Sequence, residues 1–253
     1  MTTLTELTPA ELTAAAQRRL ERWLLSPDLR DHMEHGKTSR KKKTATGPYI
    51  AISREAGSGG TEIALEVARR LGFDVLDKEL LDFMAERYKL PRDMLDVVDE
   101  TRANWFHDVL GVFFDSRLVS QDAYVAHLHR LVYLAALHGN VVFVGRAANF
   151  ILPRQSGLSV RIIAPKPQRV EYVLQRRNLQ QATAARLVDD LDGARTEFCR
   201  RHFHRDVRDP LEYDLVINTA RLAVPAAAQL IVEAFASVPR TCHSPAGQPA
   251  KSR

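Results

Sequence analysis

The sequence predicts an α/β fold: a five-stranded parallel sheet with helices packed on both of its faces. Two observations support this prediction. Short stretches are apolar almost throughout rather than at alternate positions, which is typical of strands buried on both faces. Helical patterns separate these stretches, as the crossovers of a parallel sheet require. The five predicted strands cover residues 49–53, 73–76, 141–145, 158–164 and 214–218.

The helices are predicted from apolar residues that recur at helical spacing. Residues 61–71 form one such stretch, and Gly72 follows where helices commonly end. Residues 78–138 are mostly helical in pattern. Around 118–138 the apolar residues extend beyond one stripe, which predicts a helix buried against the sheet and leaves a homodimer face as the alternative. Later helices are predicted for residues 166–177, 181–203 and 225–237.

The composition is that of a globular chain. Its 253 residues suit one domain with extensions or two small domains, and 45% of them are hydrophobic. No apolar run approaches the ~18 residues that span a bilayer, and we see no secretory signal pattern. Cys199 and Cys242 are isolated and match neither a disulfide framework nor a zinc site. We therefore expect a cytoplasmic protein.

The positive charge lies outside the predicted folded body. Residues 1–46 hold nine Lys/Arg and six Asp/Glu. Residues 240–253 hold three Lys/Arg and no Asp/Glu. Since the whole chain has a net charge of +5, residues 47–239 carry −1. A nucleic-acid-binding domain is expected to carry a basic face of its own, so this distribution argues against a nucleic-acid partner.

The same shift in composition suggests three regions. Residues 1–47 hold an amphipathic helix, expected at 9–25, and a basic linker that we interpret as solvated, with membrane-surface or nucleic-acid contact as alternatives. Residues 48–237 form the folded domain. Residues 238–253 are rich in Pro and Ser and are predicted to be disordered.

A glycine-rich turn, REAGSGGTE, follows the first predicted strand. It lies at the carboxyl edge of the sheet, where parallel sheets bind ligands. Glycines let backbone N–H groups turn inward, and the next helix adds the positive end of its dipole. Both features favour a phosphate, although a merely tight turn is the alternative. The candidate nucleotide-binding residues are Gly57, Ser58, Gly59, Gly60 and Thr61.

The turn meets only half of the P-loop pattern G-x-x-x-x-G-K-[ST]. Aligned on the second glycine of the pattern, Arg54 takes the place of the first glycine and Gly60 replaces the lysine. Thr61 stands where a Ser or Thr binds Mg²⁺. We hypothesise that Arg54 supplies the positive charge of the missing lysine in catalysis. The alternative is that Arg54 pairs with Glu55 or Glu62 and merely holds the loop.

Further polar residues stand at the same edge of the predicted sheet. Arg146 follows the third strand and can contact a phosphate with two hydrogen bonds. Asp77 and Lys78 follow the second strand. Asp77 is a candidate for Mg²⁺ or acceptor binding, with a helix N-cap as the alternative. Asp192 and Arg195 share one helical face, for which a solvated charged helix is the alternative.

Several of these segments together resemble the cytidylate kinase-like family, a branch of the nucleoside monophosphate kinases. The resemblance covers roughly residues 48–237. The matching segments, in the order of the family, are ISREAGSGGTEIA, LDKELL, VFVGRAANFIL, VRIIAP, the D-x-x-D-x-x-R run and DPLEYDLVINTARL.

The resemblance implies a P-loop kinase fold with a helical lid, which transfers the γ-phosphoryl group of ATP to a nucleoside monophosphate such as CMP, with Mg²⁺. The glycine-rich loop would hold the donor phosphates. Arg146 and Arg195 would contact phosphate and take part in catalysis, and Asp192 would read the cytosine. Asp77 and Lys78 would lie in the acceptor site.

The chain also departs from well-characterised cytidylate kinases. Ala147 stands where they have Asp after Gly-Arg, Val188 stands where an Arg begins their lid motif, and Lys78 replaces a Ser or Thr. These departures leave two alternatives open. One is a nucleotide-binding sensor or partner-docking module without turnover, and the other is a kinase for a different small acceptor.

Overall fold

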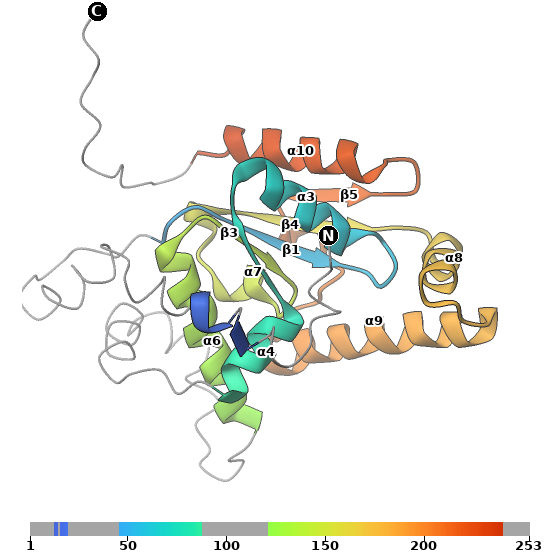
Figure 1. Cartoon of the computed structure of the whole chain (residues 1–253), viewed down its shortest axis with the longest axis horizontal. Helices are drawn as coiled ribbons and strands as arrows, with labels where there is room; N and C mark the ends of the chain where they lie inside the picture. The colour runs from blue at the N-terminus through green and yellow to red at the C-terminus, as the bar shows by residue number, and fades with distance from the viewer. Residues whose placement is uncertain (1–12, 15, 20–45, 88–120, 240–253) are drawn as a thin grey trace, which may run out of the picture.

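The computed structural model describes residues 13–14, 16–19, 46–87 and 121–239 (Figure 1). Three parts of the predictions fall outside these residues. They are most of the helix expected at 9–25 with its linker, the middle of the helical stretch 78–138, and the tail after residue 239. Of the predicted N-terminal helix, residues 13–14 and 16–19 are helical, and Ala16 is buried against the helices below the sheet.

The five predicted strands are confirmed, and all of them run parallel. Their order in the sheet is β2-β3-β1-β4-β5, so the first strand along the chain is the central one. Such an order requires crossovers, which the helices between the strands provide. The strands are β1 Tyr49–Arg54, β2 Asp74–Asp77, β3 Val141–Val144, β4 Gly157–Ile163 and β5 Leu215–Asn218.

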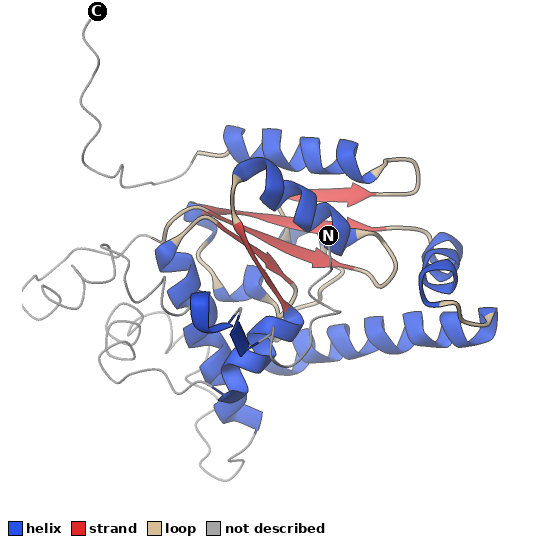
Figure 2. Cartoon of the chain, in the orientation of Figure 1, coloured by secondary structure: helices blue, strands red, loops and turns tan. Residues whose placement is uncertain are grey.

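Helices cover both faces of the sheet (Figure 2). One face is packed by α3 Gly60–Leu71 and α10 Val224–Ser237. The opposite face is packed by α4 Lys78–Arg87, α6 Gln121–His138, the short α7 Ala148–Ile151 and the C-terminal end of α9 Gln181–Phe203. The other end of α9 projects beyond the sheet and packs against α8 Lys166–Arg177.

Alternate residues of the central strand serve the two layers. Ile50 and Ile52 face α3 and α10, and Tyr49 and Ala51 face the opposite helices. All four are at most 3% exposed, which explains why this strand is apolar throughout. On β4 two buried polar residues depart from this rule, Ser159 and the charged Arg161, which is 6% exposed.

The predicted helices agree closely with the structure. Residues 166–177 and 181–203 match α8 and α9, and α6 is buried against the sheet as its apolar pattern predicted. The ends of the long helical stretch 78–138 appear as α4 and α6, while residues 88–120 lie outside the described residues. The short α7 and the 3-10 turns Arg154–Ser156 and Pro210–Glu212 were not predicted. No helix in the described part is long and apolar enough to cross a membrane.

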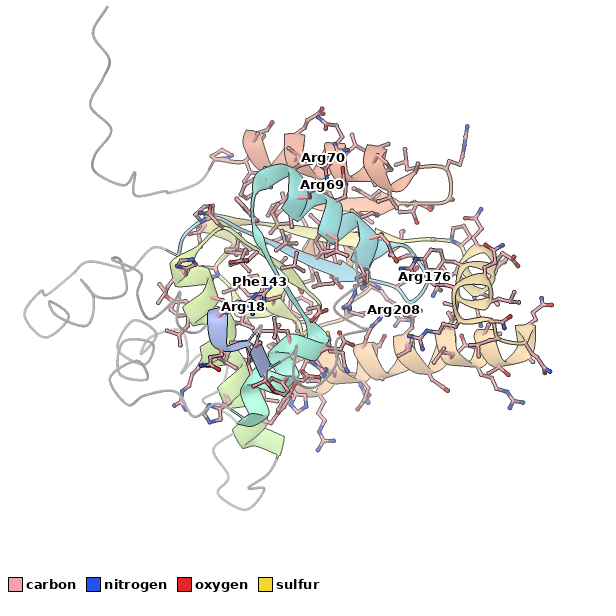
Figure 3. All side chains as sticks on the ribbon, viewed as in Figure 1. Arg18, Arg69, Arg70, Phe143, Arg176 and Arg208 are labelled. Carbon is pink, nitrogen blue, oxygen red and sulfur yellow. The ribbon has the colours of Figure 1, made fainter. Side chains whose placement is uncertain are left out.

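Phe143 tests the packing of the sheet against the helices (Figure 3). It is fully buried on β3 and meets Tyr49 edge to face at 6.2 Å between ring centroids. We expect Phe143→Ala to lower the free energy of unfolding by about 3–5 kcal/mol, because it removes apolar contacts and leaves a cavity. Urea denaturation measures this change. Leu211→Ala, at a position 81% exposed, is the control and should change stability by less than about 0.5 kcal/mol. Equal losses in both variants would contradict this account of the core.

Candidate functional site

The glycine-rich turn joins β1 to α3 at the carboxyl edge of the sheet. Gly57 and Gly59 have φ angles of 77° and 76°, a left-handed conformation that residues with a Cβ rarely adopt. A Cβ on Gly57 would also lie 2.4 Å from the carbonyl oxygen of Arg169. The conformation of this turn therefore depends on glycine.

Hydrogen bonds fix the turn from within and from β5. The Ser58 hydroxyl donates to the carbonyl of Glu55 at 2.9 Å. The Thr219 hydroxyl, just beyond β5, donates to the carbonyl of Ser58 at 2.9 Å. Ser58 is buried and does not line the cavity next to the loop. These contacts of Ser58 support the shape of the loop.

Arg169, on the first turn of α8, supports the loop from the other side. Its buried guanidinium donates to the carbonyl oxygen of Ala56 at 3.2 Å. It also pairs with the carboxylates of Asp192 at 2.5 Å and Glu55 at 3.3 Å. A buried charge is tolerated when it is paired and hydrogen-bonded in this way. Arg169 therefore joins the loop, α8 and α9 into one unit.

Asp192 takes part in this support instead of facing an open site. One carboxylate oxygen accepts the backbone N–H of Ala56 at 2.7 Å, and the other pairs with Arg169. The resemblance implied that Asp192 reads the base of the acceptor, whereas here both of its oxygens are engaged at the loop. Arg195 lies beside it, as the spacing predicted, and donates to the carbonyl of Arg54 at 3.1 Å.

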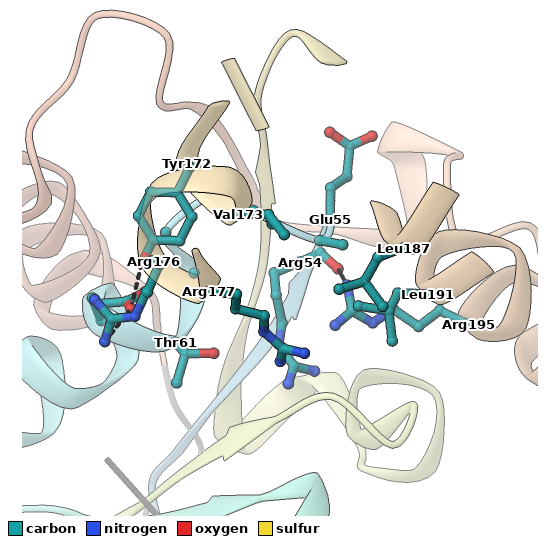
Figure 4. A pocket seen from close by; sticks show the side chains of 15 residues that line it. Arg54, Glu55, Thr61, Tyr172, Val173, Arg176, Arg177, Leu187, Leu191 and Arg195 are labelled. Carbon is teal, nitrogen blue, oxygen red and sulfur yellow. Dashed lines mark hydrogen bonds and ion pairs between the residues drawn. The ribbon is translucent and has the colours of Figure 1, made fainter. Parts of the chain in front are cut away.

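A cavity of about 350 Å³ opens beside the loop (Figure 4). Its polar wall includes Thr61 and the arginines at the end of α8, Arg176 and Arg177. Arg176 pairs with Glu62 at 3.2 Å, and the Tyr172 hydroxyl donates to the same carboxylate at 2.5 Å. The opposite wall is apolar and includes Val173 of α8 and Leu187 and Leu191 of α9. The cavity therefore combines polar and charged lining residues with an apolar side.

Arg54 lies at the inner end of this cavity (Figure 4). Burial, and after it the neighbouring Arg195, lower the pKa of Arg54 to about 10, so the guanidinium remains charged at neutral pH. Its Nε is buried with no hydrogen-bond partner in the described part of the chain. Glu55 and Glu62, the two carboxylates that were the alternative partners, pair with Arg169 and Arg176 instead. This geometry favours a role toward a ligand over a role in holding the loop.

A second cavity, of about 280 Å³, adjoins the first. Among its lining residues are the predicted Asp77, Lys78, Arg146 and Arg195, which the fold brings together from β2, α4, the turn after β3 and α9. Five lining residues are common to the two cavities: Arg54, Thr61, Arg177, Leu191 and Arg195. The two spaces thus meet along a boundary that carries three arginines.

Arg146 is oriented by a carboxylate that the sequence did not single out. It forms two hydrogen bonds with Asp82 of α4, and its guanidinium lies 5.2 Å from the centre of the Phe198 ring. Lys78 reaches the same carboxylate at 3.5 Å, and the Tyr124 hydroxyl donates to it at 2.5 Å. Burial opposes the charge of Arg146, and the hydrogen bonds with Asp82 outweigh burial, so that its pKa is raised. Arg146 and Lys78 are therefore held as a pair at one side of the second cavity.

Three residues that line the second cavity were not predicted from the sequence, and two of them are arginines. Arg161 of β4 is nearly fully buried and donates to the Ser53 hydroxyl at 2.7 Å, and its Nε has no hydrogen-bond partner among the described residues. Arg177 and Phe198 also line this space. An arginine within an otherwise apolar strand was a visible signal for Arg161, because buried charges are rare without a purpose.

Asp77 is the N-cap of α4, the alternative stated for it from the sequence. Its carboxylate accepts the backbone N–H of Leu80 at 3.0 Å. Burial raises the pKa of the Asp77 carboxyl above its ordinary value. The residue is 3% exposed yet contributes to the wall of the second cavity. The capping contact uses one of the two carboxylate oxygens.

Thr61 is the predicted Mg²⁺ ligand, and its hydroxyl points into the first cavity (Figure 4). Mg²⁺ in nucleotide sites takes one or two protein ligands together with phosphate oxygens and water. Within the described ranges, no group of three or more His, Cys, Asp or Glu side chains could hold a metal ion. The residues present therefore fit a metal that arrives with a nucleotide better than a site made by protein alone.

Asp77→Asn keeps the N-cap acceptor and removes a buried charge. Because the folded pKa of Asp77 is raised, the wild type gains stability that is complete below pH 3.8 and is lost as the pH rises through the folded pKa. The variant should lack this contribution, so its free energy of unfolding should fall less as the pH increases. Urea unfolding between pH 4 and 7 measures the difference. Asp77→Ala, which lacks the cap, should be about 1 kcal/mol less stable than Asp77→Asn. Parallel curves for wild type and Asp77→Asn would contradict this assignment.

Solved structures similar to this chain include two with the following overlaps, of which the first supports the fold. An uncharacterized protein from Eubacterium ventriosum superposes with a TM-score of 0.58 at 22% sequence identity, over 76% of this chain and 99% of that chain. A shikimate kinase from Bacteroides thetaiotaomicron overlaps more loosely, with a TM-score of 0.41 at 17% identity over 73% of this chain and 96% of that chain.

Sequence similarity to a uronate isomerase is confined to a segment of the chain. A uronate isomerase from Corynebacterium glutamicum is 32% identical over 104 residues, which are 41% of this chain and 20% of that protein. The chain thus spans about a fifth of the length of that relative.

The family comparison covers the strands and the site together. The cytidylate kinase-like family matches residues 49–221, a range that holds all five strands, the glycine-rich loop and the residues that line both cavities. The chain therefore belongs to the cytidylate kinase-like family, with the fold of the P-loop kinases.

Proposed function

We propose that the protein is a nucleotide kinase that transfers the γ-phosphoryl group of ATP to a nucleoside monophosphate, with CMP as the first acceptor to test. Family membership supports a nucleotide kinase in general. The specific proposal rests on one observation, namely that two cavities meet along a boundary of shared residues next to the glycine-rich loop. A donor in one cavity and an acceptor in the other would meet at that boundary.

The first cavity suits the donor. Backbone N–H groups at Gly59, Gly60 and the start of α3 favour phosphate, because the N-terminus of a helix carries a partial positive charge. Arg176 and Arg177 lie on the same cavity and add charge for a triphosphate. Mg²⁺ bound with the nucleotide would neutralise part of its charge, and the Thr61 hydroxyl is the residue that would meet it.

The second cavity suits a phosphorylated acceptor. Its wall holds the cations Lys78, Arg146, Arg161 and Arg195 close to the boundary with the first cavity. Arginine guanidinium groups bind phosphate oxygens in pairs, so they favour a monophosphate over a neutral acceptor. Asp192 is engaged at the loop. The acceptor assay described below measures the base selectivity of this cavity.

Transfer between these sites needs alignment and positive charge more than covalent chemistry. The chain provides both at the boundary. Arg54 and Arg195 lie where the transferred group would pass, and their charges would stabilise the negative oxygens of the transition state. Arg169 and Asp192 would act at a distance, since they hold the loop and its N–H groups in place.

Replacement of Arg54 tests the proposed function. We expect Arg54→Ala to lower acceptor-dependent ADP formation from Mg·ATP by about 10²–10³-fold, the loss typical of one removed charge-stabilising donor. CMP, dCMP and UMP are the acceptors to compare. Arg69→Ala is the matched control, because Arg69 is an exposed arginine of α3 paired with Glu66 on the helix surface (Figure 3). The control should keep wild-type turnover.

Two outcomes would overturn parts of this proposal. Full turnover in Arg54→Ala would remove Arg54 from the chemistry. Tight ATP binding by the wild type without turnover on any acceptor would favour the alternative, a nucleotide-binding sensor or partner-docking module with this fold.

A further inference from the structure

The side chain of Arg54 follows a path that two glycines leave open. At Gly60, an added Cβ would lie 2.5 Å from Cβ and 2.9 Å from Cγ of Arg54. At Gly145, just beyond β3, an added Cβ would lie 2.1 Å from Nη1 of Arg54. The Cβ and Cγ atoms of Arg54 therefore lie against Gly60, and its guanidinium lies against Gly145.

Backbone conformation does not explain the glycine at residue 60. Gly59 and Gly145 have positive φ angles, which favour glycine whatever surrounds them. Gly60 is absent from the residues with positive φ and is the first residue of α3. Apart from Arg54, the nearest atom to its added Cβ is Cβ of Ile162 at 3.5 Å, an ordinary contact. The need for glycine at this position thus arises from the Arg54 side chain alone.

The positions of Arg54 and Gly60 correspond to the first and seventh positions of the P-loop pattern. That pattern has glycine at the first position and lysine at the seventh. In this chain arginine is first and Gly60 is seventh. A side chain at either position takes the space of the other, since the two would collide at their Cβ atoms.

The surroundings of Arg54 indicate an anionic ligand for its guanidinium. Arg195 and Arg146 oppose its charge, Glu79 and Asp77 partly favour it, and no ion pair of Arg54 is formed within the described residues. Its Nε is also buried and unpartnered. A charged group held in this way is typical of a binding site that its ligand completes.

We propose that residues 54 and 60 are mutually exclusive positions for the loop cation, and that Gly60 is a positioning residue that keeps the Arg54 guanidinium at the boundary of the two cavities. The ligand of this guanidinium is the terminal phosphoryl group of a nucleoside triphosphate, and in that respect the inference rests on the proposed function. A lysine at residue 60 can therefore replace Arg54 only when the Cβ of residue 54 is absent as well.

The first test adds a single methyl group. Gly60→Ala should weaken Mg·ATP affinity and turnover about tenfold, because the two Cβ atoms would force Arg54 aside. In the Arg54→Gly background the same change should cost less than about twofold. Gly193→Ala is the matched control, since nothing lies within 4 Å of an added Cβ there. Calorimetric titration with Mg·ATP gives the affinity, and the unfolding midpoint of each variant confirms that it is folded.

The second test moves the cation. Arg54→Gly/Gly60→Lys should recover at least tenfold in affinity and turnover over Arg54→Gly, whereas Arg54→Ala/Gly60→Lys should recover nothing over Arg54→Ala because its Cβ remains. Equal behaviour of the two double variants, or wild-type affinity in Gly60→Ala, would overturn the inference.

The affinity measurements separate this inference from the proposed function. If the wild type binds Mg·ATP but turns over no acceptor, the kinase proposal fails while the dependence of Gly60→Ala on residue 54 still supports the inference. If the wild type is an active kinase and Gly60→Ala costs the same in both backgrounds, the inference fails and the function stands.

Discussion

The candidate site depends on one buried interaction, the contact of Arg169 with the glycine-rich loop. Its guanidinium reaches the Ala56 carbonyl and the carboxylates of Asp192 and Glu55 from the start of α8. Asp192 and Arg195 of α9 add contacts to the backbone of Ala56 and Arg54, and Arg169 holds Asp192 in place. Because a buried charge must be satisfied, this arginine fixes where α8 and α9 stand relative to the sheet. Both cavities take their shape from that arrangement.

Among the described residues, the remaining arginines of the site have fewer hydrogen-bond and ion-pair partners than Arg169. Arg54, Arg161 and Arg195 all line the second cavity at the carboxyl edge. In the part of the chain that the structure describes, the buried Nε atoms of Arg54 and Arg161 have no hydrogen-bond partner. Charges that repel and are poorly solvated cost the free protein stability. Proteins tolerate such costs at sites that bind ligands of opposite charge. The contrast between Arg169, fully paired, and Arg54, unpaired within the described residues, separates support of the loop from contact with the ligand.

Much of the fold was predictable because local sequence patterns coincide with it. Apolar strands, helical spacing and Gly72 at the end of α3 gave element bounds within a residue or two for most of the described domain. The role of Asp192 in reading the base was implied by the family resemblance and stays a prediction. Its contacts with Ala56 and Arg169 were not predicted, because spacing on a helix gives the face of a residue and not its partner. Arg169 was missed for the same reason, and Arg161 was missed although its place within an apolar strand was a visible signal. Their partners lie on the loop, on β1 and on α9, far from them in the chain.

The sequence by itself determined that five apolar strands alternate with helices, that a glycine-rich turn follows the first strand, and that this turn has arginine and glycine where a P-loop has glycine and lysine. These are properties of neighbouring residues, so the order of the chain contains them. Only the tertiary structure decided which charges are paired and which are left for a ligand. It also decided that Gly60 is glycine because of Arg54 and not because of its own backbone, since that distinction depends on the distance between side chains brought together by the turn.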